Sequence, residues 1–375
     1  MKRIKIIISG GGTGGHIFPA ISIANAIREM VPDAEILFVG AEGRMEMQRV
    51  PDAGYEIIGL PVAGFDRKNL FKNIPVVYKL IKSQLKARRI IKQFKPDVAV
   101  GVGGYASGPI LKAAGMAGVP TLIQEQNSYA GVTNKLLAKK AIKICVAYQE
   151  MDKFFAKEKI ILTGNPVRQD LVTSNITREE ALSKFKLQLE KKTILILGGS
   201  LGARTINQCV MSHLDDIRNS GVQFIWQTGK IYYDQAMEAV STYVSNSQLS
   251  ALNSQLVVTD FIKDMASAYK AADLIISRAG AGSISEFSIL EKAVILVPSP
   301  NVAEDHQTKN AMALVNKGAA ILVKDAEANE KLISTALQTI TDEEALKSLS
   351  INISKMALPN SANIIAKEVL KLVES

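Results

Sequence analysis

Two glycine-rich turns constrain the fold more than any other feature of the sequence. The first turn, at residues 10–15, follows the apolar run Ile4–Ile8, and the second, at residues 198–202, follows Thr193–Leu197. A strand that ends in a glycine turn and leads into a helix is typical of an anion site. Backbone N–H groups point at the ligand there, and the missing Cβ atoms let a phosphate come close. The two turns therefore predict two halves, each with a phosphate-binding crevice.

Runs typical of strands alternate with helical patterns along most of the chain, which predicts parallel sheets covered by helices on both faces. The expected strands are Ile4–Ile8, Glu35–Val39, Val98–Val102, Pro120–Ile123, Lys143–Ala147, Thr193–Leu197, Gln223–Gln227, Leu256–Thr259, Leu274–Ser277, Val294–Val297 and Ala320–Val323. The expected helices of the first half are Ala20–Met30, Tyr78–Lys92, Pro109–Met116 and Asn134–Lys140. We expect an α/β fold of two doubly wound Rossmann-like domains that face a cleft.

The turn-rich segment Gly164–Arg168 predicts the junction between the domains, which we expect to span residues 1–165 and 166–359. A last helical stretch, Asn360–Val373, follows Pro359 and can belong to either half. We expect this C-terminal helix, at about residues 360–375, to pack back on the first domain.

The net charge of +9 indicates an anionic partner, which can be a nucleic acid, a phosphorylated substrate or an acidic membrane surface. Between Asp66 and Lys95, ten basic residues accompany a single acid. Apolar residues recur there at helical spacing: Ile74, Val77, Tyr78, Ile81, Leu85 and Ile91. This pattern is typical of a basic amphipathic helix at a membrane surface, and the alternative is the solvated face of an ordinary helix. The segment offers no stacking platform or RNA-binding motif, which argues against nucleic acid.

Two cysteines in unrelated contexts, Cys145 and Cys209, argue against a disulfide framework or a zinc site and fit a reducing cytoplasm. The apolar run near the start of the sequence is too short for a signal peptide. No apolar stretch approaches the ~20 residues that span a bilayer. We therefore expect a soluble or peripheral protein.

The first turn also fits the dinucleotide-binding pattern G-x-G-x-x-G, but the acid that should follow the second strand, Glu42, comes late. A second pair of glycine turns lies at residues 101–109 and 277–286. In the latter, the amides from Ala281 to Ser283 would open a helix toward a diphosphate, and Glu286 would accept hydrogen bonds from two ribose hydroxyls. The alternative for Glu286 is an acid of the first helical turn, favoured by the helix dipole.

Seven stretches, in their order and spacing, resemble one family nearly from end to end: the bacterial glycosyltransferases (MurG family) that add N-acetylglucosamine to the lipid-linked muramyl-pentapeptide of peptidoglycan. They are Gly11–His16, Gly103–Pro109, Glu125–Asn127, Gly164–Arg168, Gly198–Ala203, Gly280–Glu286 and Asp305–Ala311. The sequence departs from the family at Leu201, where a polar residue is frequent, and at Gln124, where a histidine is frequent. The second departure removes one candidate base.

The resemblance implies a glycosyltransferase of the GT-B type. Its first domain would bind the undecaprenyl-diphosphate-linked muramyl-pentapeptide and face an anionic membrane surface, and its second would bind UDP-N-acetylglucosamine. The implied donor contacts are Thr13, Gly14, Gly15 and Asn127 for the sugar side, Arg168 and Ser200 for the diphosphate, Ile262 for the uracil, Ala281, Gly282 and Ser283 for the phosphates, Glu286 for the ribose and Gln307 for sugar hydroxyls. On the acceptor and membrane side we expect Tyr105, Ser107, Lys72, Lys79, Lys82 and Lys86. A lipid-linked acceptor favours the membrane interpretation of the basic segment and a peripheral location on the cytoplasmic face of the cell membrane.

The implied reaction is an inverting displacement in which the C4 hydroxyl of the muramyl sugar of lipid I attacks the anomeric carbon and UDP leaves, giving the β-1,4 bond of lipid II. His16, at the tip of the first turn, is the leading candidate base, because an imidazole exchanges protons near neutral pH. Alternatively, His16 caps a helix or binds an acceptor phosphate, and Glu125 is the second candidate base. No Asp-x-Asp motif ends a suitable strand, so we expect no metal and no cofactor, with helix N-termini and Arg168 stabilising the leaving group.

Three other functions compete with this hypothesis. A UDP-N-acetylglucosamine 2-epimerase on a similar fold would also recognise a UDP-sugar, but it would need no basic lipid-facing segment. A nicotinamide-dependent oxidoreductase fits the first turn but not the motifs of the second half. A non-catalytic, membrane-peripheral UDP-sugar sensor would need Glu286 but not His16.

Overall fold

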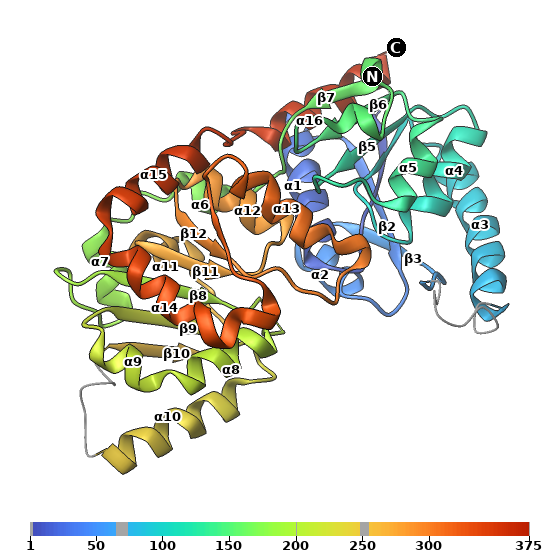
Figure 1. The fold of residues 1–375 in the computed structure, drawn as a ribbon. Helices are drawn as coiled ribbons and strands as arrows, with labels where there is room; N and C mark the ends of the chain where they lie inside the picture. The colour runs from blue at the N-terminus through green and yellow to red at the C-terminus, as the bar shows by residue number, and fades with distance from the viewer. Residues whose placement is uncertain (1–2, 65–73, 200, 248–254, 375) are drawn as a thin grey trace. The chain divides into compact units, whose positions relative to one another are not determined.

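The computed structural model describes residues 3–64, 74–199, 201–247 and 255–374. It divides into two compact units (Figure 1). Unit 1 comprises Met1–Arg168 and Leu358–Ser375, and unit 2 comprises Gln169–Ala357. The chain therefore leaves unit 1, forms the whole of unit 2 and returns to unit 1.

Unit 1 is built on a seven-stranded parallel sheet with the order β3-β2-β1-β4-β5-β6-β7. Its strands are β1 (Lys5–Ser9), β2 (Glu35–Ala41), β3 (Glu56–Leu60), β4 (Val98–Gly101), β5 (Thr121–Glu125), β6 (Lys143–Val146) and β7 (Ile160–Leu162). Its helices are α1 (Gly14–Met30), α2 (Glu46–Asp52), α3 (Ile74–Phe94), α4 (Ser107–Met116), α5 (Val132–Ala138) and α16 (Ser361–Glu374), with short 3-10 turns at Met151–Lys153 and Lys157–Lys159. The order reverses between β1 and β4, and ligands of such sheets bind outside the carboxyl ends of the strands at that point.

Alternate residues of β1 supply the two cores of unit 1, because successive side chains of a strand point to opposite faces. Ile6 and Ile8 are buried with apolar residues of α1 and α16. Ile7 is buried in a second cluster with residues of α3, α4 and α5. The sheet is thus covered by helices on both faces, and α16 completes one of them.

Unit 2 repeats this plan with a six-stranded parallel sheet in the order β10-β9-β8-β11-β12-β13. Its strands are β8 (Thr193–Leu197), β9 (Gln223–Gln227), β10 (Leu256–Thr259), β11 (Leu274–Ser277), β12 (Ala293–Leu296) and β13 (Ile321–Leu322). Its helices are α6 (Gln169–Thr173), α7 (Arg178–Lys184), α8 (Arg204–Ser212), α9 (Leu214–Asn219), α10 (Tyr233–Ser247), α11 (Met265–Ala271), α12 (Ala281–Ile289), α13 (His306–Val315), α14 (Ala328–Thr341) and α15 (Glu343–Ser354), with 3-10 turns at Ala303–Asp305 and Asp325–Glu327.

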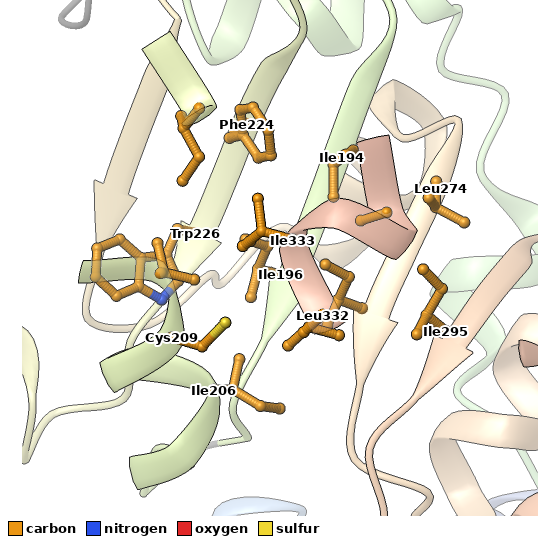
Figure 2. Close-up of a cluster of buried hydrophobic side chains, with 14 of the residues drawn as sticks. Ile194, Ile196, Ile206, Cys209, Phe224, Trp226, Leu274, Ile295, Leu332 and Ile333 are labelled. Atoms are coloured by element: carbon orange, nitrogen blue, oxygen red, sulfur yellow. The ribbon is translucent and has the colours of Figure 1, made fainter. Parts of the chain in front are cut away.

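One core of unit 2 is a cluster of buried side chains between its strands and helices α8 and α14 (Figure 2). Trp226 of β9 is completely buried there, and its indole N–H donates to Oδ1 of Asn207 at 3.0 Å. The side-chain amide of Asn207 in turn donates to the carbonyl of Thr228 at 2.8 Å. The large aromatic side chain thereby fixes helix α8, which follows the second glycine turn, against the sheet.

The α/β fold with two doubly wound sheets is confirmed, and the differences from the expected elements are local. Helix α1 begins at Gly14 rather than at Ala20, with Pro19 inside it. As the sixth residue of α1, Pro19 lacks the N–H that would donate to the carbonyl of Gly15, so the helix loses one backbone hydrogen bond there. Strands β3 and β7 were not expected from the sequence.

Candidate active site

The first glycine turn connects β1 to α1 and holds His16 in a defined orientation. Thr13 is the N-cap of α1 in an extended conformation, and Gly14 and Gly15 form the first turn of the helix. The Nδ1 atom of His16 lies 3.1 Å from the carbonyl oxygen of Gly11 and 3.3 Å from Oγ1 of Thr13. A carbonyl oxygen can only accept, so Nδ1 carries the proton and the lone pair of the neutral ring is on Nε2. This is the tautomer in which Nε2 can accept a proton.

The loop after β4 leaves space for the imidazole of His16 because it lacks a side chain at Gly103. An ideal Cβ on Gly103 would lie 2.8 Å from Nε2 of His16 and 2.6 Å from Cδ2. Gly103 also has a φ of 100°, which favours glycine. An ideal Cβ on Gly104 would lie 2.4 Å from the carbonyl oxygen of Gly11. The two glycine turns of unit 1 therefore pack backbone against backbone beside the reversal of strand order, with His16 between them.

Glu46 is a buried residue beside the first glycine turn that sequence reasoning missed. It is the first residue of α2, is 0% exposed, and accepts hydrogen bonds from the backbone N–H groups of Gly12 and Ala41, each at 2.9 Å. The prediction that the amides of the first turn point at a ligand phosphate is therefore wrong for Gly12, because a carboxylate of the chain itself occupies that amide. A lone acid at a helix start carries no sequence signal for such a contact.

Glu125, the last residue of β5, is buried, and its carboxylate accepts four hydrogen bonds. The donors are the backbone N–H groups of Asn127 at 3.0 Å and Gly131 at 3.0 Å, and the side-chain amides of Asn127 at 3.3 Å and Asn134 at 2.8 Å. The carboxylate thus shapes the loop after β5 and fixes Asn127. Four donors already satisfy its lone pairs, which favours His16 over Glu125 as the proton acceptor.

A buried amide network lies beside this loop. The side-chain amide of Gln124 donates to Oδ1 of Asn165 at 2.9 Å. The side-chain amide of Asn165 donates to the backbone carbonyl of Gln126 at 3.0 Å. Gln124 is completely buried. The position where the family frequently has histidine therefore lies inside unit 1 here and holds the end of β5 to the segment after β7.

Ser107 does not lie on the acceptor surface, and this expectation is wrong. Its side chain is completely buried, and its Oγ lies 2.8 Å from the carbonyl oxygen of Gly103 and 2.9 Å from that of Ser9. The hydroxyl thus ties the loop after β4 to the end of β1. Tyr105, two residues earlier, is exposed. Arg168 is half-buried at the end of the first segment of unit 1.

In unit 2, helix α12 begins at Ala281, directly after β11 and the N-cap Gly280. Its first three residues, Ala281, Gly282 and Ser283, are half-buried, and a Cβ on Gly282 would meet nothing within 4 Å. The first turn of α12 contains no acidic residue. The partial positive charge of this helix end favours an anion.

Glu286 lies beyond the first turn of α12, so the alternative explanation of a first-turn acid does not apply. The hydroxyl of Tyr269, from α11, donates to Oε2 of Glu286 at 2.7 Å. Tyr269 was not expected from the sequence, because no motif joins it to α12. The hydrogen bond fixes the carboxylate about one helical turn from the N-terminus of α12.

Two glutamines of unit 2 accept hydrogen bonds from backbone N–H groups of the chain. Gln227, at the end of β9, accepts from the backbone N–H of Ile262 at 2.9 Å and donates to the carbonyl of Gly199 at 3.2 Å. The N–H of Ile262 is thus used within the protein. Gln307, the second residue of α13, accepts from the backbone N–H of Ser299 at 2.9 Å. Ser200 lies outside the described residues.

Helix α3 carries an exposed apolar face edged by lysines. Its exposed apolar side chains, which are 42% to 60% exposed, are Val77, Tyr78, Leu80, Ile81 and Leu85. Lys79 and Lys82 are exposed, the ammonium of Lys82 lies 4.8 Å from the Tyr78 ring centroid, and Lys86 pairs with Glu42 at 2.9 Å. Ile91, expected on this face, is instead buried in the core of unit 1. Lys72 lies outside the described residues, as do the other positions from 65 to 73.

Over the described ranges, no helix is long and apolar enough to cross a membrane. Within the same part of the chain, no three or more His, Cys, Asp or Glu side chains are grouped so that they could hold a metal ion.

Two doubly wound sheets, with glycine turns at the reversal of strand order in each, are the architecture of glycosyltransferases of the GT-B type. Residues 6–146 match the glycosyltransferase family 28 N-terminal domain and residues 193–365 match the family 28 C-terminal domain. The chain belongs to glycosyltransferase family 28 and, within it, to the MurG family.

Two relatives define this placement. A protein of Phocaeicola vulgatus named UDP-N-acetylglucosamine--N-acetylmuramyl-(pentapeptide) pyrophosphoryl-undecaprenol N-acetylglucosamine transferase is 70% identical over 100% of this chain and 97% of its own length. The crystal structure of Acinetobacter baumannii MurG is 27% identical, with a TM-score of 0.77 over 99% of this chain and 100% of that one. A solved UDP-N-acetylglucosamine 2-epimerase, 15% identical with a TM-score of 0.66 over 99% of this chain and 96% of its own, shares the fold alone.

Proposed function

We propose that the protein transfers N-acetylglucosamine from UDP-N-acetylglucosamine to the C4 hydroxyl of the muramyl sugar of an undecaprenyl-diphosphate-linked muramyl-pentapeptide. The acceptor is lipid I and the product is lipid II, with inversion to a β-1,4 bond. Unit 1 binds the acceptor and unit 2 binds the UDP-sugar. The observation that carries the proposal is the oriented His16, whose Nδ1 contacts the Gly11 carbonyl at 3.1 Å and leaves Nε2 as the proton acceptor.

In the proposed reaction, the acceptor hydroxyl oxygen forms a bond to the anomeric carbon of the donor sugar. Nε2 of His16 takes the hydroxyl proton as this bond forms. The bond from the anomeric carbon to the β-phosphate oxygen breaks, and UDP leaves with the electron pair. The growing negative charge is stabilised by the N-terminus of α12 and by Arg168.

The donor contacts follow from the arrangement of unit 2. The first turn of α12, Ala281–Ser283, caps the diphosphate, and Glu286, held by Tyr269, accepts hydrogen bonds from the ribose hydroxyls. Because its N–H is engaged by Gln227, Ile262 has its carbonyl left for the uracil. Gln307 holds sugar hydroxyls. Ser200 adds a diphosphate contact as the family resemblance implies, although it lies outside the described residues.

The sugar and the acceptor meet the loops of unit 1. Thr13, Gly14, Gly15 and the Asn127 side chain, which Glu125 fixes, line the side where the sugar lies. Exposed Tyr105, in the loop after β4, lies on the side proposed for the acceptor. No metal or organic cofactor is part of this proposal.

The test is the release of UDP from UDP-N-acetylglucosamine, measured with and without a soluble analogue of the muramyl lipid diphosphate. Release that requires the acceptor, together with a disaccharide product, is the expected result. Release without acceptor, or conversion of the donor to its manno epimer, contradicts the proposal and favours the epimerase. His16→Ala should lower kcat by about 100-fold or more while UDP still binds, as expected for the loss of a general base.

We further propose that the exposed face of α3 rests on the anionic cytoplasmic surface of the cell membrane. Its apolar side chains enter the interface, and Lys79 and Lys82 meet lipid phosphates, at about 1 kcal/mol for each basic residue. Ile81→Glu should reduce sedimentation with vesicles of anionic lipid. The matched control is Ile351→Glu, an exposed isoleucine on α15 of unit 2, which should sediment as the unmodified protein does. Equal sedimentation of both variants would refute the membrane role of α3.

A further inference from the structure

We infer that Glu46 is a positioning residue for His16 and acts through the single peptide group that joins Gly11 to Gly12. The inference rests on the proposed function, because it assigns Glu46 a role in orienting the proposed base. Glu46 is 0% exposed, at the start of α2, and its carboxylate lies beneath the first glycine turn.

The contacts form one continuous chain. Oε2 of Glu46 accepts from the N–H of Gly12 at 2.9 Å. The carbonyl of that same peptide group, on Gly11, accepts from Nδ1 of His16 at 3.1 Å. Because the peptide group is planar and rigid, fixing its N–H also fixes the direction of its carbonyl. The carboxylate and the imidazole are thus linked by one peptide plane.

Charge adds to this geometry. A carboxylate that accepts from a peptide N–H polarises the peptide and makes its carbonyl a stronger acceptor, because hydrogen bonds in a chain reinforce one another. A stronger acceptor at Gly11 holds the proton on Nδ1 of His16 and favours the positive charge that the ring acquires when Nε2 takes a proton. A carboxylate bonded directly to a catalytic histidine fixes its tautomer in the same way. Here a peptide group stands between the two.

The surrounding backbone is shaped to admit this side chain. An ideal Cβ on Gly11 would lie 2.1 Å from Oε1 of Glu46, and one on Gly40 would lie 2.6 Å from its Cγ. Oε1 also accepts from the N–H of Ala41 at 2.9 Å, which anchors the carboxylate to the end of β2. Burying a carboxylate costs free energy even when it is hydrogen-bonded. A neutral side chain would therefore make a purely structural contact at this position at a lower cost.

The test is a double-mutant cycle of Glu46→Gln and His16→Ala, read as kcat and as KM for UDP-N-acetylglucosamine. Glu46→Gln keeps the size of the side chain and removes its charge, so kcat should fall about tenfold while KM changes less than about twofold, as for loss of a charge-assisted hydrogen bond. In the His16→Ala background, Glu46→Gln should cause no further loss of kcat. The matched control is Glu56→Gln, which removes an exposed carboxylate from β3 of the same unit and should leave kcat unchanged.

Three outcomes overturn the inference: an unchanged kcat in folded Glu46→Gln, an equal loss in the His16→Ala background, or a loss matched by Glu56→Gln. Should Glu46→Gln fail to fold, Glu46→Asp takes its place, because it keeps the charge but withdraws it by one methylene from Gly12. The ¹⁵N chemical shifts of the His16 ring give a second readout, since they report which nitrogen carries the proton. We expect the proton on Nδ1 in the unmodified protein and a larger share on Nε2 in either Glu46 variant, and unchanged shifts would also overturn the inference.

These readouts separate the inference from the proposed function. If His16→Ala keeps full transfer, His16 is not the base and the proposed mechanism fails. The ¹⁵N shifts still show in that case whether Glu46 orients the ring. If His16→Ala loses transfer but Glu46→Gln does not, the mechanism stands and the role of Glu46 fails.

Discussion

Replacing Gly103 by alanine should displace the imidazole of His16 and thereby slow the transfer. The new Cβ would lie 2.6 Å from Cδ2 of the ring, whereas ordinary contacts begin at 3.4 Å, so the ring has to move by 3.4 − 2.6 = 0.8 Å. Misplacing a reacting group by about 1 Å can cost on the order of 100-fold in rate. We therefore expect kcat to fall by about that factor.

The substitution also carries a cost in stability that must be separated from the effect on the ring. Gly103 has a φ of 100°, and a left-handed conformation costs a residue with a Cβ roughly 1–2 kcal/mol. For a domain of this size, that cost lowers Tm by about 2–8 °C. Gly118, at a φ of 78° just after α4 in the same unit, is the matched control because a Cβ there would meet nothing within 4 Å. Gly118→Ala should lose similar stability but keep its kcat.

The assay is acceptor-dependent UDP release at saturating substrates, at a temperature where calorimetry shows both variants to be folded. A hundredfold lower kcat in Gly103→Ala, with the control unchanged, is the expected result. The reasoning is refuted if folded Gly103→Ala keeps its kcat within about twofold, because the ring would then tolerate the displacement. An equal loss in Gly118→Ala would refute it as well, since strain rather than the ring contact would be responsible.

Three further predictions concern unit 2. Gly282→Ala should stabilise the folded protein by at most about 1 kcal/mol of helix propensity and so raise Tm, but it should weaken UDP binding in calorimetry, because the methyl group would lie where we propose that the diphosphate meets α12; unchanged affinity would contradict that position of the diphosphate. Tyr269→Phe should weaken UDP binding about fivefold by releasing Glu286, and an unchanged affinity would exclude that positioning role. The hydrogen bond from Lys184 lowers the pKa of Asp264 to about 2, below its unfolded value of 3.8, so its stabilisation is full above about pH 4 and is lost as the pH falls toward 2. Asp264→Asn should therefore lower Tm at pH 5 to 7, and calorimetry should show the difference shrinking below pH 4; a constant difference would contradict this origin.

Much of the fold could be predicted because the central strands are buried on both faces and read as continuous apolar runs. Thr193–Leu197 and Leu274–Ser277 have the predicted bounds for this reason. The missed strands, β3 and β7, are the two edges of the sheet of unit 1, and each is only partly buried. These two edge strands of unit 1 bury less apolar surface than the central strands, so they leave a weaker pattern in the sequence.

The candidate site could be predicted only where its residues are neighbours in the sequence. His16 and the start of α12 lie in glycine motifs whose local geometry is readable. Glu46 and Tyr269 reach the site from other elements, and a single sequence holds no trace of such pairings. Ser107 shows the opposite error, because it lies within a glycine motif but its hydroxyl points inward to backbone carbonyls.

The return of the chain to unit 1 has a consequence for biosynthesis. Helix α16 contributes Ile365, Ala366 and Val369 to a core shared with α1, and none of the three is exposed. On the ribosome, the whole of unit 2 emerges before this helix does, so one face of unit 1 stays uncovered until α16 has emerged. We expect the nascent N-terminal segment to need protection by chaperones throughout that interval. A message truncated before Leu358 would encode every proposed site residue and still yield a protein that aggregates.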